Sequence, residues 1–160
     1  MIGYARDEIT RKREKRHMQG DRKMLEAFYS CSTCNAEKDA VFVVDIEPVK
    51  EALTKRLKEH AHSVDWSRVV GFIDVSRHSN SSAGILVCET KAYFFGFPKK
   101  PVKVWYDEIN GIVARKSKEE FVGIKLRFRD GSDFTWESNA LDCRSLAVMF
   151  NKLRCARIEI

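Results

Sequence analysis

The sequence lacks long apolar runs and a recognisable export signal. No uninterrupted apolar stretch approaches the ~18 residues that a membrane-spanning helix needs, so we expect no transmembrane segment. The opening stretch, MIGYARDEIT, carries charges where a secretory signal requires an apolar region. The five cysteines are an odd number without dense spacing, which does not indicate a disulfide framework. A reducing, cytoplasmic location is therefore expected.

The sequence also lacks the short motifs that accompany catalysis. It contains no G-x-S-x-G, no P-loop, no H-E-x-x-H and no glycine-rich dinucleotide turn. Asp107 and Glu108 are adjacent carboxylates, but neighbouring side chains on a strand point apart and cannot share a proton. We therefore expect a non-catalytic protein without a cofactor.

The composition indicates a globular protein. The chain has 160 residues, of which 44% are hydrophobic and 11% aromatic, enough for one domain plus an appendage. The net charge of +6 is compatible with weak attraction to an anionic surface or nucleic acid, and equally with simple solubility.

The clearest pattern is the stretch FVGIKLRFRDGSDFTW, residues 121–136. Its apolar and basic side chains alternate, with Ile124, Leu126 and Phe128 on one side, which predicts a half-buried strand. Asp130-Gly131 offers two positive-φ positions for a tight turn, after which the alternation resumes. This pattern predicts a β-hairpin.

A helical stripe follows that hairpin. Leu146, Met149, Phe150 and Leu153 have the spacing i, i+3, i+4, i+7, which predicts an amphipathic helix packed on the sheet. Ser138 or Asn139 is expected to cap its start.

The chain from residue 68 onward reads as a succession of antiparallel strands. The expected strands are 69–76, 84–89, 92–97, 102–106, 112–117 and the two strands of the 121–136 hairpin. Asn110-Gly111 is expected to form a hairpin turn. A shorter β-prone run, 41–45, comes earlier, and Pro48 is expected to open a helix at about 48–60 with an inner stripe of Val49, Ala52, Leu53 and Leu57.

The N-terminal part favours a basic helical extension. Residues 5–29 contain no proline, and their first half is almost wholly charged. One interpretation is a solvated arm whose far end docks on a neighbour, and the other is an arm that binds phosphates. The basic residues available for nucleic-acid binding are Arg11, Lys12, Arg13, Lys15, Arg16, Arg22 and Lys23.

Residues 30–39, SCSTCNAEKD, are expected to form a loop that contains a C-x-x-C pair. Cys31 and Cys34 have the spacing of a zinc knuckle, but tetrahedral zinc needs two further ligands, for which His60 and His62 are the nearest candidates. Two ordinary thiols and no metal is the preferred interpretation. The expected organisation is an extension over 1–40 and a folded domain over 41–160.

The order of the strands and the final helix resembles the pleckstrin-homology (PH) superfold, in particular the bacterial PH-like and GRAM-type domains. The matching segments are GILVCETKAYFFGF, VWYDEINGI, IKLRFRDGSDFTW and LAVMFNKL, and the resemblance covers about residues 68–155. It implies an α+β fold, a seven-stranded antiparallel barrel or sandwich closed by a C-terminal helix. It also implies an interaction module rather than an enzyme, because such domains mostly recognise lipids, peptides or protein surfaces.

The resemblance directs attention to basic residues near the strand connections. In phosphoinositide-binding relatives, basic residues flank the first strand-to-strand loop; Arg77 and His78 enter that loop here, but the next strand, ILVCE, lacks the basic partner. An alternative patch would combine Lys99, Lys100 and Lys103 with Arg115, Lys116 and Lys118. We expect a protein partner or self-assembly, with weak affinity for anionic surfaces, and the alternative is non-specific nucleic-acid binding through the N-terminal arm.

Overall fold

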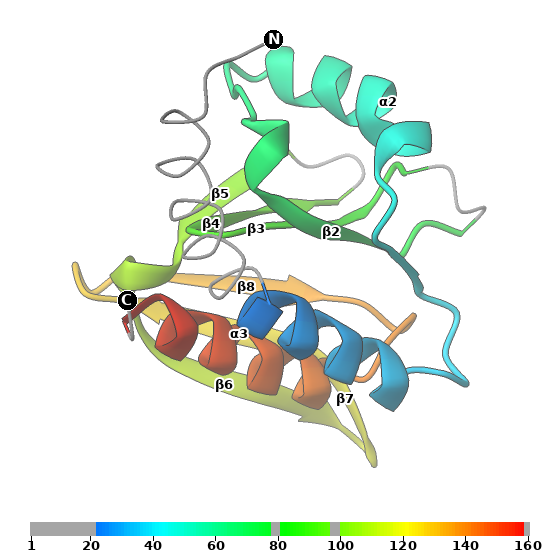
Figure 1. The fold of residues 1–160 in the computed structure, drawn as a ribbon. Coiled ribbons are helices and arrows are strands. Elements are labelled where there is room, and N and C mark those ends of the chain that lie inside the picture. Colours follow the sequence, from blue (N-terminus) through cyan, green and yellow to red (C-terminus); the bar gives the residue numbers. More distant parts are fainter. Residues whose placement is uncertain (1–21, 78–80, 97–99, 159–160) are drawn as a thin grey trace, which may run out of the picture.

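The computed structural model describes residues 22–77, 81–96 and 100–158, with the side chains of the last helix described as far as Arg154. A helix over residues 22–34 comes first and is called helix 22–34 below (Figure 1). The other helices are α2 (Glu47–Lys58) and α3 (Cys143–Ile158), with 3-10 turns η1 (Trp66–Arg68) and η2 (Tyr106–Glu108). The strands are β1 (Val41–Val43), β2 (Val69–Asp74), β3 (Gly84–Cys88), β4 (Lys91–Phe95), β5 (Val102–Trp105), β6 (Ile109–Ser117), β7 (Glu120–Phe128) and β8 (Asp133–Glu137).

The strands form two antiparallel sheets. The first has the order β1-β2-β3-β4-β5 and the second the order β6-β7-β8. The α+β class and the seven strands expected after residue 68 are confirmed, and the β-prone run at 41–45 contributes the edge strand β1 to the first sheet. The two sheets are not closed into a barrel, so that option of the sequence-based expectation is wrong.

The β7–β8 hairpin confirms the alternation read from the sequence. Ile124 and Leu126 are fully buried, while Arg127 is exposed. The turn differs from the expectation, because Gly131 has a positive φ of 89° and Asp130 does not. The Asp130 carboxylate instead accepts hydrogen bonds from the amide and hydroxyl of Ser132, which stabilises a longer loop.

Asn110-Gly111 does not form the hairpin turn expected from the sequence. Both residues lie inside β6, where the pairing with β7 shifts register between Ile109 and Gly111. The chain reaches β6 from β5 through η2 and changes sheet there, so β5 and β6 are not hairpin partners. Asn110-Gly111 instead forms a β-bulge, which changes the direction of the strand where it enters the second sheet.

Helix α2 covers the outer face of the first sheet (Figure 1). Pro48 lies in its first turn, as expected, because a missing amide has no cost there. Leu53 and Leu57 are buried against a second, smaller core cluster that includes Phe72, Leu86, Tyr93 and Phe95. Ala52, which the sequence placed on the inner stripe, is exposed. The apolar stripe of α2 is therefore narrower than the sequence suggested.

The main core lies between the inner face of the first sheet, the second sheet and two helices. The stripe Leu146, Met149, Phe150 and Leu153 of α3 is buried there, as predicted. The expected caps are wrong, because α3 begins at Cys143 and the Asp142 carboxylate accepts the Arg144 amide at 3.0 Å. Ser138 instead accepts the Ala140 amide, and Asn139 is exposed.

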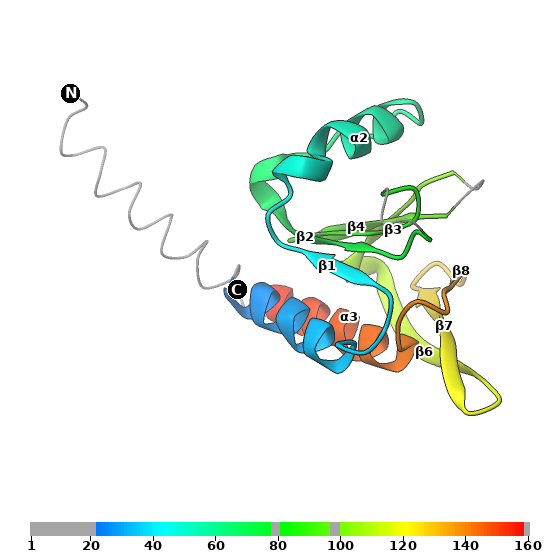
Figure 2. The ribbon, with the colours of Figure 1, turned by 90° about the vertical axis from the view of Figure 1, so that its right-hand side faces the viewer.

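Helix 22–34 belongs to this core as well. It lies alongside α3 and runs in the opposite direction (Figures 1 and 2). Met24, Ala27, Phe28 and Cys31 are buried in the main cluster. The loop expected at 30–39 is wrong for residues 30–34, which continue the helix because Cys31 completes its buried stripe.

Phe28 explains how helix 22–34 approaches the sheet so closely. A Cβ atom at Gly71 of β2 would lie 2.6 Å from Phe28 Cζ, so the ring packs directly over the glycine backbone. The same ring contacts Phe42 at a centroid distance of 5.4 Å. No helix of the described residues is long and apolar enough to span a membrane.

Candidate functional site

The basic residues singled out around the strand connections are not joined by common contacts. Lys103 Nζ lies 5.3 Å from the Trp105 ring on β5, and Lys116 Nζ lies 5.7 Å from the Phe121 ring on the other sheet. Arg115 is paired with Glu137 at 3.3 Å. Arg77 and Lys100 are exposed, and His78 and Lys99 lie outside the described residues.

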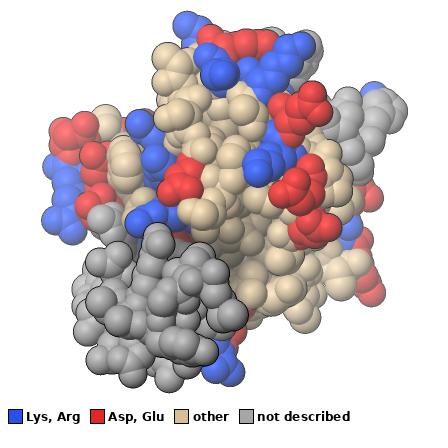
Figure 3. All heavy atoms as spheres, turned by 45° about the horizontal axis from the view of Figure 1, so that its top comes forward, with Lys and Arg blue, Asp and Glu red and all other residues tan. Residues whose placement is uncertain are grey.

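Among the described residues, charges of both signs are mixed on the face that carries α2. Lysine and arginine side chains are interspersed there with aspartate and glutamate (Figure 3). Such mixing gives little long-range attraction to an anionic surface.

Five of the seven basic residues predicted to bind nucleic acid lie before the described part of the chain. Arg11, Lys12, Arg13, Lys15 and Arg16 lie outside the described residues. Arg22 and Lys23 begin helix 22–34, where Arg22 Nε lies 3.5 Å from the Glu26 carboxylate. Both members of that pair are well exposed, so its contribution to stability is small.

Cys31 and Cys34 occupy the last turn of helix 22–34, and His60 and His62 follow α2. Among the described residues, no three His, Cys, Asp or Glu side chains are grouped so that they could hold a metal ion. His62 contacts the Tyr93 ring at 5.5 Å. Burial raises the pKa of the Cys31 thiol to about 11, and the carboxyl end of a helix further disfavours a thiolate.

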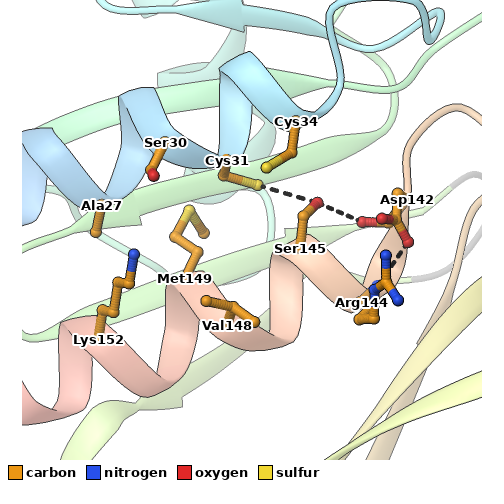
Figure 4. A pocket seen from close by; sticks show the side chains of 10 residues that line it. All are labelled: Ala27, Ser30, Cys31, Cys34, Asp142, Arg144, Ser145, Val148, Met149 and Lys152. Atoms are coloured by element: carbon orange, nitrogen blue, oxygen red, sulfur yellow. Dashed lines mark hydrogen bonds between the residues drawn. The ribbon is translucent and has the colours of Figure 1, made fainter.

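A pocket of about 170 Å³ lies in the seam between helix 22–34 and α3, and we call it the helix groove (Figure 4). One wall is helix 22–34 and the other is α3 with the residue before it. Its lining residues are Ala27, Ser30, Cys31, Cys34, Asp142, Arg144, Ser145, Val148, Met149 and Lys152.

The groove follows from the spacing of residues on the two helices. Ala27, Cys31 and Cys34 are separated by four and three residues and therefore share a face of helix 22–34. Ser145, Val148 and Lys152 do the same on α3. Small side chains on the first helix leave the seam unfilled. Val148 remains 50% exposed at its edge although its neighbour Met149 is buried.

A buried side-chain amide links the two walls of the helix groove. Asn35 is 3% exposed, donates to the Cys31 carbonyl at 2.7 Å and donates to Ser145 Oγ at 2.8 Å. Ser145 Oγ in turn donates to the Asp142 carbonyl at 2.6 Å and lies 3.7 Å from Cys31 Sγ. This network fixes the end of helix 22–34 to the start of α3.

The charges around the helix groove are unequal. Arg144 stands over the Phe121 ring at 5.2 Å, and Lys152 is exposed farther along α3. Within the described part of the chain, neither side chain takes part in an ion pair. The Asp142 carboxylate lining the groove is engaged as the cap of α3.

A second hollow of about 380 Å³ continues from the groove toward the β6–β7 turn and shares Cys34, Asp142 and Arg144 with it. Its other charged residues are Lys38, Lys116, Glu119 and Glu120. Cations and carboxylates are balanced there, so this hollow does not add to the positive character of the groove.

The sequence alone does not predict this site. Its patterns place Cys31 and Cys34 in a loop and predict only the inward-facing stripe of α3. A signal was present, because Arg144, Val148 and Lys152 repeat every four residues on the opposite side of α3. These residues of α3 line a groove only because helix 22–34 packs beside them.

No protein-family model matches this sequence, and no curated protein matches it significantly. Among solved structures, the chain is similar to one described as the C-terminal domain of an unknown protein from Leishmania infantum. That similarity has 11% sequence identity and a TM-score of 0.42, and it covers 66% of this chain and 97% of the other.

Proposed function

We propose that this chain is a non-catalytic interaction module of the PH-like kind, and that it binds a protein partner in the helix groove. The PH-like assignment is supported by the order of elements: four consecutive antiparallel strands β2–β5, three more in β6–β8, and then α3. Helix 22–34, α2 and β1 are additions to that order.

The chemistry of the groove favours binding over catalysis. The Ser145 hydroxyl is engaged with the Asp142 carbonyl, and none of the histidines that the structure describes lines the groove to act as its base. The pKa of the Cys31 thiol is about 11, because burial disfavours its charged form, so little thiolate exists near neutral pH.

The observation that carries the proposal is the half-exposed Val148 beside an open pocket with apolar walls. Single exposed apolar residues are common, but Val148 adjoins Met149 and Ala27 around one concavity. A partner side chain seated there would remove these apolar atoms from water, which favours association by about 25 cal/mol for each Å² buried.

The test compares Val148→Asp with Val113→Asp. Val113 is 45% exposed on β6 and does not line the groove, so it is a matched control for an added surface carboxylate. Partners recovered with the wild-type chain would be purified and their affinities measured directly. We expect Val148→Asp to lose a partner that wild type and Val113→Asp both bind, with unchanged melting temperatures. Equal affinity of all three proteins for every purified partner would contradict the proposal.

A further inference from the structure

Arg144 and Lys152 lie on the same side of α3, with Val148 between them. Successive residues of a helix rise 1.5 Å, so their backbones are about 12 Å apart along the axis. We propose that the helix groove recognises an acidic amphipathic helix, with one apolar side chain entering the pocket and a carboxylate near each cation. This inference rests on the function proposed above and names the chemistry of the partner.

The size of the pocket fits a single apolar anchor. A volume of about 170 Å³ accommodates a large aliphatic or aromatic side chain. Ala27, Val148 and Met149 supply the apolar walls. Anchors of this kind, seated in a pocket and shielded from water, dominate the affinity of many interfaces.

The charges favour an acidic partner rather than a basic one. Arg144 and Lys152 form no ion pairs within the described residues and are free to meet carboxylates. Asp142, whose carboxylate accepts the Arg144 amide, is the single acidic residue among the described residues that line the groove, so two cations stand there against one anion. The start of α3 adds the positive end of a helix dipole beside Arg144.

The walls favour a helical partner rather than an extended one. Both walls are helices, whose backbone groups are mostly hydrogen-bonded internally, so the groove offers no strand edge. An extended segment bound there would lose water from backbone groups without gaining partners for them. A helix satisfies its own backbone and can pack its side chains into the seam between two others.

The probes are three capped, alanine-rich helical peptides of about 16 residues, a length at which isolated helices begin to be populated. The first carries one leucine with glutamates four residues before and four after it. The second has lysines in place of both glutamates, and the third has alanine in place of leucine. Each would be titrated into the full-length, isotope-labelled protein and followed by amide chemical shifts.

We expect the glutamate–leucine peptide to bind about tenfold more tightly than the lysine peptide at low salt, and the alanine peptide to bind most weakly. The shifted amides should cluster at Ala27, Ser145, Val148 and Lys152. In Lys152→Glu the preference for glutamate should shrink or reverse. It should persist in Lys58→Glu, which makes the same charge change on the exposed end of α2.

The outcomes separate this inference from the function on which it rests. Equal binding of the glutamate and lysine peptides, lost in Val148→Asp, would overturn the acidic preference and leave the interaction groove intact. Shifts confined to other surfaces, or no binding of the glutamate–leucine peptide, would overturn the inference. A wild-type dimer that Val148→Asp converts to a monomer would assign the groove to a second copy of the chain and overturn it as well.

Discussion

The Asn35 side chain accepts a hydrogen bond of 2.6 Å from the backbone amide of Asp142, across 107 residues of sequence. The Nδ2 atom of the same Asn35 side chain donates to Ser145 Oγ. One side chain therefore joins the end of helix 22–34 to the start of α3. Its hydrogen-bond partners Cys31, Asp142 and Ser145 all line the helix groove.

Asn35→Ala should destabilise the fold by about 1–3 kcal/mol, because buried groups on both helices lose their hydrogen-bond partners. Urea unfolding followed by circular dichroism measures the change. Asn139→Ala removes an exposed asparagine three residues before Asp142 and should leave the midpoint nearly unchanged. Equal midpoints for the two variants would show that the Asn35 hydrogen bonds contribute no net stability.

Gly71→Ala should also destabilise the fold, by about 1–3 kcal/mol through overpacking. The new methyl group would lie 2.6 Å from Phe28 Cζ and 2.9 Å from the Val43 carbonyl oxygen, so the Phe28 ring and the backbone of β1 must shift to make room for it. Gly111→Ala is the control, because its nearest neighbour would be 3.8 Å away. Phe28→Leu in the Gly71→Ala background should cost less than in wild type. If the effects of the two substitutions on the free energy of unfolding are additive in this double-mutant cycle, Gly71 and Phe28 are not energetically coupled.

Leu126→Ala should cost about 2–5 kcal/mol, because Leu126 is fully buried and its truncation leaves a cavity. Lys125→Ala, on the opposite face, breaks only a partly exposed ion pair with Asp133 and should cost at most about 1 kcal/mol. Both variants are compared by urea unfolding. A larger loss of unfolding free energy in Lys125→Ala than in Leu126→Ala would mean that Lys125, and not Leu126, lies on the buried face of β7.

That alternation is the kind of feature that the sequence predicts well. The burial of Leu126 and of the α3 stripe depends on periodicities of two and 3.6 residues, which are local and visible in the chain. Both features are therefore predicted correctly, because the spacing of apolar residues along the chain determines which face of a strand or helix is apolar.

The features that the sequence missed depend on distant segments. Asn110-Gly111 has the local chemistry of a tight turn, but the change of sheet at η2 overrides it. The helix groove exists only because residues 27–35 pack against residues 142–152, more than 100 positions later. No periodicity within either segment specifies that pairing, so the groove could not be predicted from either helix alone.

Alkaline pH should destabilise the protein through its buried thiols. Burial raises the pKa of Cys31 and Cys143 to about 11 and that of Cys88 to about 12, from 9.0 for an ordinary thiol. The folded state therefore retains these protons after the unfolded chain has released them. Their contribution to stability is complete below about pH 9 and is lost as the pH rises from there through about 11 for Cys31 and Cys143 and about 12 for Cys88.

Within that window each thiol should lower the free energy of unfolding by up to about 1.4 kcal/mol for each pH unit. Urea unfolding in the presence of a reductant, repeated between pH 7.5 and pH 10.5, measures the slope. Because the slope sums over every ionisable group of the protein, the decisive comparison is between variants. Cys31→Ala should have a shallower slope than wild type, because it removes one thiol whose pKa is raised by burial. A Cys31→Ala slope as steep as that of wild type would mean that the Cys31 thiol titrates alike in the folded and unfolded chains, and that its burial is not maintained in solution.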